Sequence, residues 1–310
     1  MEYTHKPVLL KECLGGLNIK AGGIYVDGTL GRAGHSLEIV KRLTTGRLIA
    51  IDRDKAALDA APARLEGHMD KVTLVRGNFG DLTNILASLN VGGVDGMLFD
   101  LGVSSPQLDD GSRGFSYLQD APLDMRMDQS APLTARDVVN GWSREELKRI
   151  LWQYGEERYS GPIAAAIVRE REKAPIETTG QLAELVRSAM SAKARREKQH
   201  PAKRSFQAIR IAVNDELGEV ERLLPAALGA LNAGGRLAVI SFHSLEDRLV
   251  KTFYADWAKG CTCPPDFPVC VCGRKPKVKL VGKRPIVADE AELNENPRAR
   301  SAKLRVAEKV

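Results

Sequence analysis

Residues suited to binding a nucleoside cofactor gather in the segment VDGTLGRAGHS at 26–36. An apolar strand is predicted there to run into a turn with Gly28, Gly31 and Gly34, and then directly into a helix. Glycine lets the backbone approach a ligand closely, and the first turn of a helix offers unpaired N–H groups. Asp52, at the end of the next predicted strand, can accept two hydrogen bonds from ribose hydroxyls. The glycine spacing departs from GxGxxG, which argues against a dinucleotide.

Further candidate residues stand where predicted strands end. Ligands of an open parallel sheet bind outside the carboxyl ends of its strands, so we expect one crevice. Its lining would include Asp27, Asp52, Asn78, Phe79 and Asp100. Asp27 and Asp100 are expected to meet a cationic part of the cofactor, and Phe79 to pack on a purine ring. The competing interpretation makes Phe79 a core residue and the aspartates caps of turns.

Methyl transfer is the reaction that these residues favour. Carboxylates at strand ends, without a phosphate-binding lysine after the glycine turn, suit the positive centre of S-adenosylmethionine. Methyl transfer needs alignment of nucleophile and methyl group, and no metal or covalent intermediate. The predicted catalytic residues are Asp100, Ser105 and Pro106. A backbone carbonyl of the turn at 104–106 would accept from the exocyclic amine of a base, with Asp100 nearby to receive its proton.

The turn at 104–106 also has a simpler interpretation. Pro106 restricts the preceding residue, so we expect Ser105 to be extended and its carbonyl to be aimed by the proline. The same residues are typical of a tight turn after any strand.

The elements that must position these residues follow an α/β pattern. Strands are predicted at 24–27, 48–52, 72–75, 97–101 and 236–242, and helices alternate with the early ones, for example at 35–43 and 54–65. This alternation predicts a parallel sheet with right-handed crossovers. Because the fifth strand arrives so late, we expect an inserted helical domain at 126–214 between core segments 1–125 and 215–310.

The inserted segment and the C-terminus carry their own signals. Capping boxes at Ser143–Glu146 and Thr178–Gln181 predict helix starts. Apolar residues at helical spacing from Phe206 to Leu228 predict one long helix, which Pro225 kinks or ends. The alternating pattern near the C-terminus predicts an edge strand.

Charge points to a polyanionic partner. The chain of 310 residues has a net charge of +6, but the runs 193–204 and 274–284 carry +11 between them, so the remainder carries −5. One such run is usually a solvated face, whereas two favour RNA or DNA. Lys203, Arg204, Lys275, Lys277, Arg298 and Arg300 are the predicted RNA contacts. Without a signal peptide or a long apolar run, we expect a cytoplasmic protein and no membrane partner.

Four cysteines form the pattern CxC-x6-CxC: Cys261, Cys263, Cys270 and Cys272. Four thiolates could hold zinc tetrahedrally and stiffen the basic loop that follows, although C-x-C is tighter than the usual zinc spacing. The alternative is a proline-rich loop with reduced thiols, since a structural disulfide is unexpected in the cytoplasm. The sequence leaves this metal site open.

Several long motifs resemble the bacterial ribosomal RNA small subunit methyltransferase H family: VDGTLGRAGHS, AIDRD, GNF, FDLGVSSPQLD, HPAKRSFQAIRIAVNDEL, ISFHSLEDR and NPRARSAKLRVAE. The resemblance implies a Rossmann-like, S-adenosylmethionine-dependent core with an inserted helical domain. It also implies N4-methylation of a cytidine in 16S rRNA, at the decoding centre (P site) of the small ribosomal subunit. The implied cofactor contacts are Ala33, Gly34, His35, Asp52, Phe79, Asp100 and Gln107. The family commonly has glycine at the position of Ala33.

Some alternatives stay open from the sequence. His35 is expected to be a neutral cofactor contact, because a helix N-terminus disfavours protonation. His243 could stabilise a turn or contact substrate. A rival function is an RNA-binding assembly factor that keeps the cofactor pocket, and another is methylation of DNA cytosine or of a protein side chain. Whether the substrate is naked rRNA or an assembled subunit, and whether the chain forms a homodimer, is also open.

Overall fold

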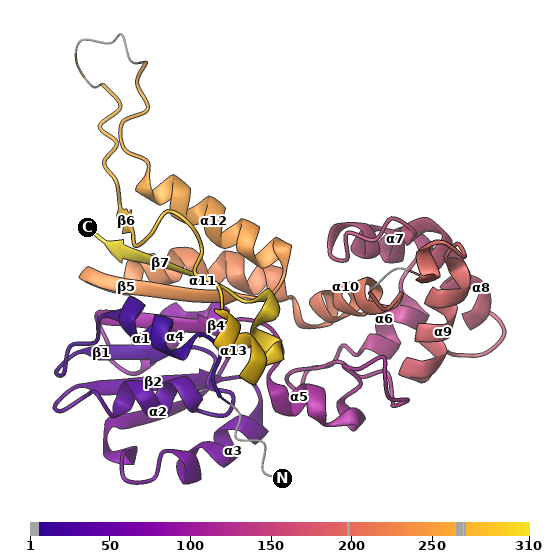
Figure 1. The fold of residues 1–310 in the computed structure, drawn as a ribbon, viewed down its shortest axis with the longest axis horizontal. Coiled ribbons are helices and arrows are strands. Elements are labelled where there is room, and N and C mark those ends of the chain that lie inside the picture. The colour runs from indigo at the N-terminus through magenta and orange to yellow at the C-terminus, as the bar shows by residue number, and fades with distance from the viewer. Residues whose placement is uncertain (1–5, 197–198, 265–268, 270) are drawn as a thin grey trace. The chain divides into compact units, whose positions relative to one another are not determined.

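Figure 1 shows the computed structural model, which describes residues 6–196, 199–264, 269 and 271–310, with only the backbone of Ser105. The chain divides into two compact units. The core unit comprises Met1–Gly102 and Leu217–Val310, and the helical unit comprises Val103–Glu216.

One seven-stranded sheet organises the described part of the core unit, in the order β3-β2-β1-β4-β5-β7-β6. The strands are β1 (Ile24–Asp27), β2 (Arg47–Asp52), β3 (Val72–Arg76), β4 (Val94–Asp100), β5 (Leu231–Ser241), β6 (Val278–Leu280) and β7 (Lys303–Lys309). Neighbouring strands among β1 to β5 are parallel, so the predicted parallel sheet is confirmed. Their order is that of a Rossmann-like sheet, and β1 to β4 end at one edge.

Helices cover both faces of this sheet. They are α1 (Leu10–Leu17), α2 (Gly34–Val40), α3 (Lys55–Arg64), α4 (Leu82–Ser88), α11 (Glu216–Ala230), α12 (Ser244–Ala258) and α13 (Glu290–Glu295), with 3-10 turns η1 (Met69–Lys71), η2 (Phe79–Asp81) and η5 (Pro297–Ser301). Alternate strand residues face opposite sides, so Val26 packs in the cluster with α4, α11 and α12, while Tyr25 packs in the cluster with α1, α2 and α3. The two apolar clusters hold the strand ends in place.

The helical unit has its own apolar core, built mainly from helix faces. Its helices are α5 (Ser105–Asp109), α6 (Ala135–Gly141), α7 (Arg144–Gln153), α8 (Ser160–Arg171), α9 (Thr179–Ala189) and α10 (Lys203–Asn214), with 3-10 turns η3 (Gly111–Arg113) and η4 (Ala194–Arg196). Both predicted capping boxes are present, at Ser143 and Thr178. The helical unit begins at Val103, whereas the sequence predicts its edge near 125. The difference arises because Phe115 and Leu123 are buried in the core of this unit, although they lie in a segment without a helical pattern of apolar residues.

Two further sequence predictions differ from the structure. The predicted long helix is two helices, because Asp215 between α10 and α11 has a φ of 48°, a left-handed conformation that ends α10. Pro225 lies inside α11 and does not end it. The C-terminal strand β7 is not an edge strand, since it pairs antiparallel with both β5 and β6. No helix in the described part of the chain is both long and apolar enough to cross a membrane.

Replacement of Gly28 by alanine is expected to destabilise the core unit by ~1–3 kcal/mol, because overpacking a core is costly. A Cβ at this position would overlap the ring of buried Phe99. Urea denaturation of Gly28→Ala gives the measurement. The matched control is Gly15→Ala in α1, where a Cβ meets nothing within 4 Å and should stabilise the helix by up to ~1 kcal/mol. Equal unfolding free energies for the two variants would contradict the close approach of Gly28 to Phe99.

Candidate active site

The glycine-rich turn between β1 and α2 is held by the side chain of Asp27. Its Oδ1 accepts from the Thr29 N–H at 3.1 Å, and its Oδ2 accepts from the Ser36 hydroxyl at 2.6 Å. Gly31 and Ala33 both have left-handed backbone, with φ of 49° and 56°. This conformation favours glycine, so Ala33 adopts a backbone geometry that a glycine would adopt without steric cost. Asp27 therefore shapes the turn that opens α2.

Asp52 at the end of β2 joins the same turn. Its Oδ2 accepts from the Gly31 N–H at 2.8 Å, and its Oδ1 accepts from the Asp54 N–H at 2.8 Å. Burial raises the pKa of the Asp52 carboxyl despite these two bonds. Each carboxylate oxygen has more than one acceptor position, so Asp52 keeps capacity for the hydroxyls of a ligand. The sequence-predicted pairing of the glycine turn with Asp52 is present as a direct contact.

Asp100, at the end of β4, is the acid of the site whose negative charge the surrounding protein stabilises least. Burial, and then the nearby carboxylates of Asp27 and Glu246, raise the pKa of Asp100 to about 8. Its side chain is 26% exposed, yet its Oδ1 is buried and accepts no hydrogen bond from the residues that the structure describes. At neutral pH the carboxyl is therefore mostly protonated, and a nearby positive charge would favour its ionised form.

His35, in the first turn of α2, lies beside this carboxyl. Its Nε2 is 3.0 Å from the Val8 carbonyl oxygen, and its Nδ1 is 3.9 Å from Oδ2 of Asp100. Burial lowers the pKa of His35 to about 4, so the ring is neutral and donates its one N–H to Val8. The pair of His35 and Asp100 is thus an imidazole facing a carboxylic acid, and not an ion pair, at neutral pH.

Asn78 and Phe79 follow β3. The ring of Phe79 packs edge-on against Phe99, with 5.9 Å between centroids, and belongs to the apolar core. The guanidinium carbon of Arg53 lies 5.5 Å from the centroid of the Phe79 ring. Asn78 Oδ1 is a second buried acceptor without a hydrogen-bond partner in the described part of the chain. Two such acceptors at strand ends suit a ligand that brings donors or positive charge.

The segment after β4 belongs to the helical unit and forms a helix start. Ser104 is extended, and its N–H donates to Gln107 Oε1 at 3.0 Å in a capping box. Ser105 is the first residue of α5, so the expectation that it is extended is wrong. The first helical turn tolerates Pro106 because its N–H would have no partner there. The Ser104 carbonyl already accepts from the Leu108 N–H at 3.2 Å and keeps one lone pair.

Positive side chains begin helix α10. Lys203 and Arg204 occupy its first turn, where no acidic residue offsets them and where the helix dipole disfavours cations. Arg204 lines a pocket within the helical unit, together with Glu157, Arg158, Tyr159, Met190, Ala194, Gln199, His200 and Pro201. The ring of His200 stacks on Tyr117, with 4.4 Å between centroids. This concentration of cations and aromatic rings suits nucleic acid.

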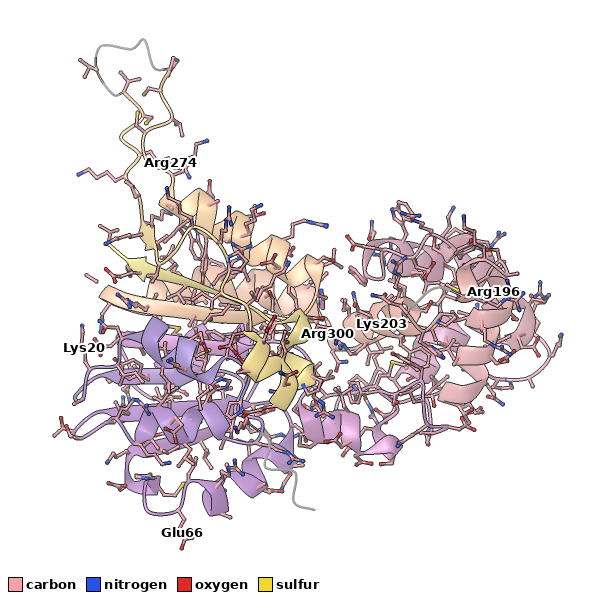
Figure 2. All side chains as sticks on the ribbon, viewed as in Figure 1. Lys20, Glu66, Arg196, Lys203, Arg274 and Arg300 are labelled. Carbon is pink, nitrogen blue, oxygen red and sulfur yellow. The ribbon has the colours of Figure 1, made fainter. Side chains whose placement is uncertain are left out.

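The other predicted RNA contacts are exposed residues of the core unit. Lys275 and Lys277 lie beside Arg274 near the base of an arm between α12 and β6, while Arg298 lies with Arg300 in η5 (Figure 2). His243 is the N-cap of α12, and its Nδ1 accepts from the Glu246 N–H at 3.4 Å. The sequence left His243 either a turn-stabilising or a substrate-contacting role, and this cap corresponds to the first.

Sequence reasoning missed two residues that shape the site. The Thr29 hydroxyl accepts from the Asp100 N–H at 2.6 Å and so ties the glycine turn to β4. Glu246 accepts from the Phe242 N–H at 2.8 Å and places its charge near Asp100. The bond of Glu246 to Phe242 is local, but Asp100 is remote in the sequence from both Thr29 and Glu246, so no local pattern could assign the contacts with Asp100.

Replacement of Asp100 by asparagine is expected to stabilise the ligand-free protein by ~1–3 kcal/mol at neutral pH. The folded state keeps a proton on Asp100 that the unfolded chain loses, so wild-type stability falls as pH rises from about 4 towards about 8. Asp100→Asn does not lose stability in this way, so the difference between the melting temperatures of the variant and the wild type should widen as the pH rises from about 4 to about 8. Thermal unfolding at several pH values measures it.

The matched control for this comparison is Asp70→Asn, which makes the same atomic change in the exposed turn η1. Its melting temperature should follow that of the wild type. Parallel curves for wild type and Asp100→Asn across the whole pH range would contradict the perturbed carboxyl.

Comparison with known proteins identifies the family. A model of the MraW methylase family matches residues 2–310. A protein from Brevibacillus brevis named ribosomal RNA small subunit methyltransferase H is 58% identical over 311 residues, covering 100% of this chain and 99% of that relative. A protein of the same name from Paenibacillus sp. is 59% identical over 315 residues, covering 99% and 100% respectively.

A solved structure of a putative rRNA-methylase from Clostridium thermocellum covers 99% of this chain and 100% of that one, at 12% identity and a TM-score of 0.44. So weak a likeness carries no argument, whereas the family model and the relatives span the chain. The chain belongs to the MraW methylase family and is an S-adenosylmethionine-dependent methyltransferase.

Proposed function

We propose that this chain methylates the exocyclic N4 amine of a cytidine in 16S rRNA, at the decoding centre of the small ribosomal subunit. The observation that carries the proposal is the half-buried Asp100 carboxyl at the end of β4. Its Oδ1 accepts no hydrogen bond from the described residues, so it can interact with a cationic methyl donor and with an amine. The whole-length relatives named ribosomal RNA small subunit methyltransferase H support the choice of RNA. The cytoplasm is the expected location.

The residues at the carboxyl edge of the sheet fit S-adenosylmethionine. When bound, S-adenosylmethionine supplies a methyl group on a positively charged sulfur. Asp52 offers remaining acceptor capacity to ribose hydroxyls, and Asn78 offers a buried carbonyl oxygen that has no partner in the described part of the chain. Asp27, Ala33, Gly34, His35, Phe79 and Gln107 complete the proposed cofactor set. The left-handed backbone at Gly31 and Ala33 opens the first turn of α2 towards the ligand.

Asp100 is proposed to act on the proton of the amine. The nitrogen of cytidine N4 is a poor nucleophile because its lone pair is delocalised into the ring. Beside a positive charge the pKa of Asp100 falls, so the carboxylate becomes able to accept the N–H of the amine. As the new N–C bond forms and the S–C bond breaks, one proton leaves the nitrogen for Asp100. The Ser104 carbonyl, with its remaining lone pair, and the turn at Ser105 and Pro106 are the proposed partners for orienting the amine.

The pH dependence of cofactor binding tests the role of Asp100. Affinity of the wild type for S-adenosylmethionine should rise between about pH 6 and about pH 9, with the change centred near the pKa of about 8. In Asp100→Asn the part of this pH dependence that comes from ionisation of Asp100 should disappear. Because titration of the ligand itself is common to both proteins, the difference between their calorimetric profiles isolates the carboxyl. Identical profiles would remove Asp100 from the cofactor site.

The reaction and its acceptor are tested by transfer of labelled methyl groups to small ribosomal subunits that lack the modification. Nucleoside mass spectrometry should find the label in N4-methylcytidine, with naked rRNA, DNA and protein measured alongside. Asp100→Asn should lose the activity while remaining folded. Label in DNA, in protein or in another nucleoside would overturn the proposed acceptor. Cofactor binding without transfer to any acceptor would favour the RNA-binding assembly factor.

Charge reversal at the start of α10 tests the proposed RNA contact. The double variant Lys203→Glu, Arg204→Glu should bind rRNA about tenfold or more weakly and lower the salt dependence of binding by about two units in slope, because each phosphate contact releases counterions. Cofactor affinity should be unchanged. The matched control reverses two exposed charges of the core unit, Lys11→Glu and Lys55→Glu. Equal losses in the two double variants would mean that only net charge matters.

A further inference from the structure

Three cysteine sulfurs converge on the arm between α12 and β6. Cys261 and Cys263 lie on the outgoing limb and Cys272 lies on the returning limb, and their Sγ atoms all lie within 4.8 Å of one another. Figure 1 shows this arm extending away from the sheet and from α12. Cys270, the remaining cysteine of the motif, lies outside the described residues, so the three described sulfurs carry the inference.

The spacing of the sulfurs suits a metal ion. The Sγ atoms of Cys261 and Cys272 are 3.7 Å apart. A disulfide bond would require about 2.0 Å. Zinc bound tetrahedrally to thiolates at about 2.3 Å separates its sulfur ligands by about 3.8 Å. The distance across the two limbs is therefore that of two ligands of one zinc ion.

Backbone N–H groups are directed at all three sulfurs. Thr262 donates to Cys272 Sγ at 3.4 Å, Cys263 donates to Cys261 Sγ at 3.4 Å, and Val271 donates to Cys263 Sγ at 3.3 Å. Hydrogen bonds donated to metal ligands orient them and offset the negative charge that several thiolates bring to one metal. The loop backbone is thus arranged around the sulfurs.

Among the described residues of the arm, 259–264, 269 and 271–277, no apolar side chain is buried. Val269 and Val271 are 70% and 74% exposed. Its base is fastened, because Arg274 donates to Asp256 Oδ1 at 2.7 Å and the Lys277 N–H donates to the Trp257 carbonyl at 2.7 Å. Beyond this base a metal would supply the missing folding energy, as it does in other small metal-bound loops.

We propose that Cys261, Cys263 and Cys272 bind one Zn²⁺ ion that crosslinks the two limbs of the arm. Each thiol gives up its proton to solvent as its sulfur binds the metal. The ion has a structural role, since it orders the returning limb, which leads into the basic residues from Arg274 onward. The site consists of cysteine sulfurs of the arm and does not require the proposed RNA substrate.

Metal analysis of the full-length chain tests the proposal. Protein purified under reducing conditions without chelator should contain about one zinc ion per chain by mass spectrometry of the metal. After removal of zinc, Co²⁺ should give a thiolate-to-cobalt charge-transfer band and the intense visible bands of tetrahedral cobalt. Cys261→Ser and Cys272→Ser should each lose the zinc and this spectrum. The control Cys13→Ala removes a cysteine of α1 that is buried in the core unit, and it should keep both.

Cofactor binding by calorimetry shows that each variant is folded, because the three sulfurs lie on the arm and not at the strand ends. Wild-type protein that takes up neither zinc nor tetrahedral cobalt would overturn the proposal, as would full zinc content in Cys261→Ser and Cys272→Ser. These readouts do not depend on methyl transfer. Failure of the proposed function would therefore leave the metal result unaffected.

Discussion

The half-buried carboxyl of Asp100 is the constraint on which the rest of the site depends. It ends a central strand close to two other acids, and both neighbours have bonds that the fold needs. Asp27 holds the glycine turn through Thr29 and Ser36, and Glu246 accepts from the backbone at the start of α12. Neither acid can move away without loosening an element. The electrostatic cost of placing three acids together is therefore built into the fold, and a positive charge beside Asp100 would lower it.

The arrangement around Asp100 also settles the charge state of its neighbour. His35 donates from Nε2 to the Val8 carbonyl, which leaves Nδ1 without a proton on the side that faces Asp100. Because burial keeps the ring neutral, His35 adds no positive charge that could satisfy the acid internally. Asp100 thus has two carboxylates and a neutral imidazole near it, and none of these three groups brings a positive charge.

Much of the fold follows from local pattern. The five parallel strands overlap their predicted positions, since buried parallel strands are continuous apolar runs, although β5 starts five residues earlier than predicted. The divided helix at Asp215 and the inner position of β7 were not predictable. A left-handed residue other than glycine carries no strong sequence signal, and the neighbours of a strand are chosen by packing of the whole sheet. The early start of the helical unit likewise was not predictable, because Phe115 and Leu123 lie in loops and join the unit only through burial in its core.

The sequence by itself determined the kinds of chemical group and their order along the chain: a glycine turn, acids at strand ends, two basic runs and clustered cysteines. Those features suffice for the fold class and the family, because motif spacing reflects local backbone geometry. Only the tertiary structure decided which acid is perturbed and which acids hold the turn or cap a helix. It also decided that the cysteines of two limbs approach one another. The physical reason is that a pKa, an unpaired buried oxygen and a ligand cluster all depend on groups distant in sequence, whose separations are set by packing.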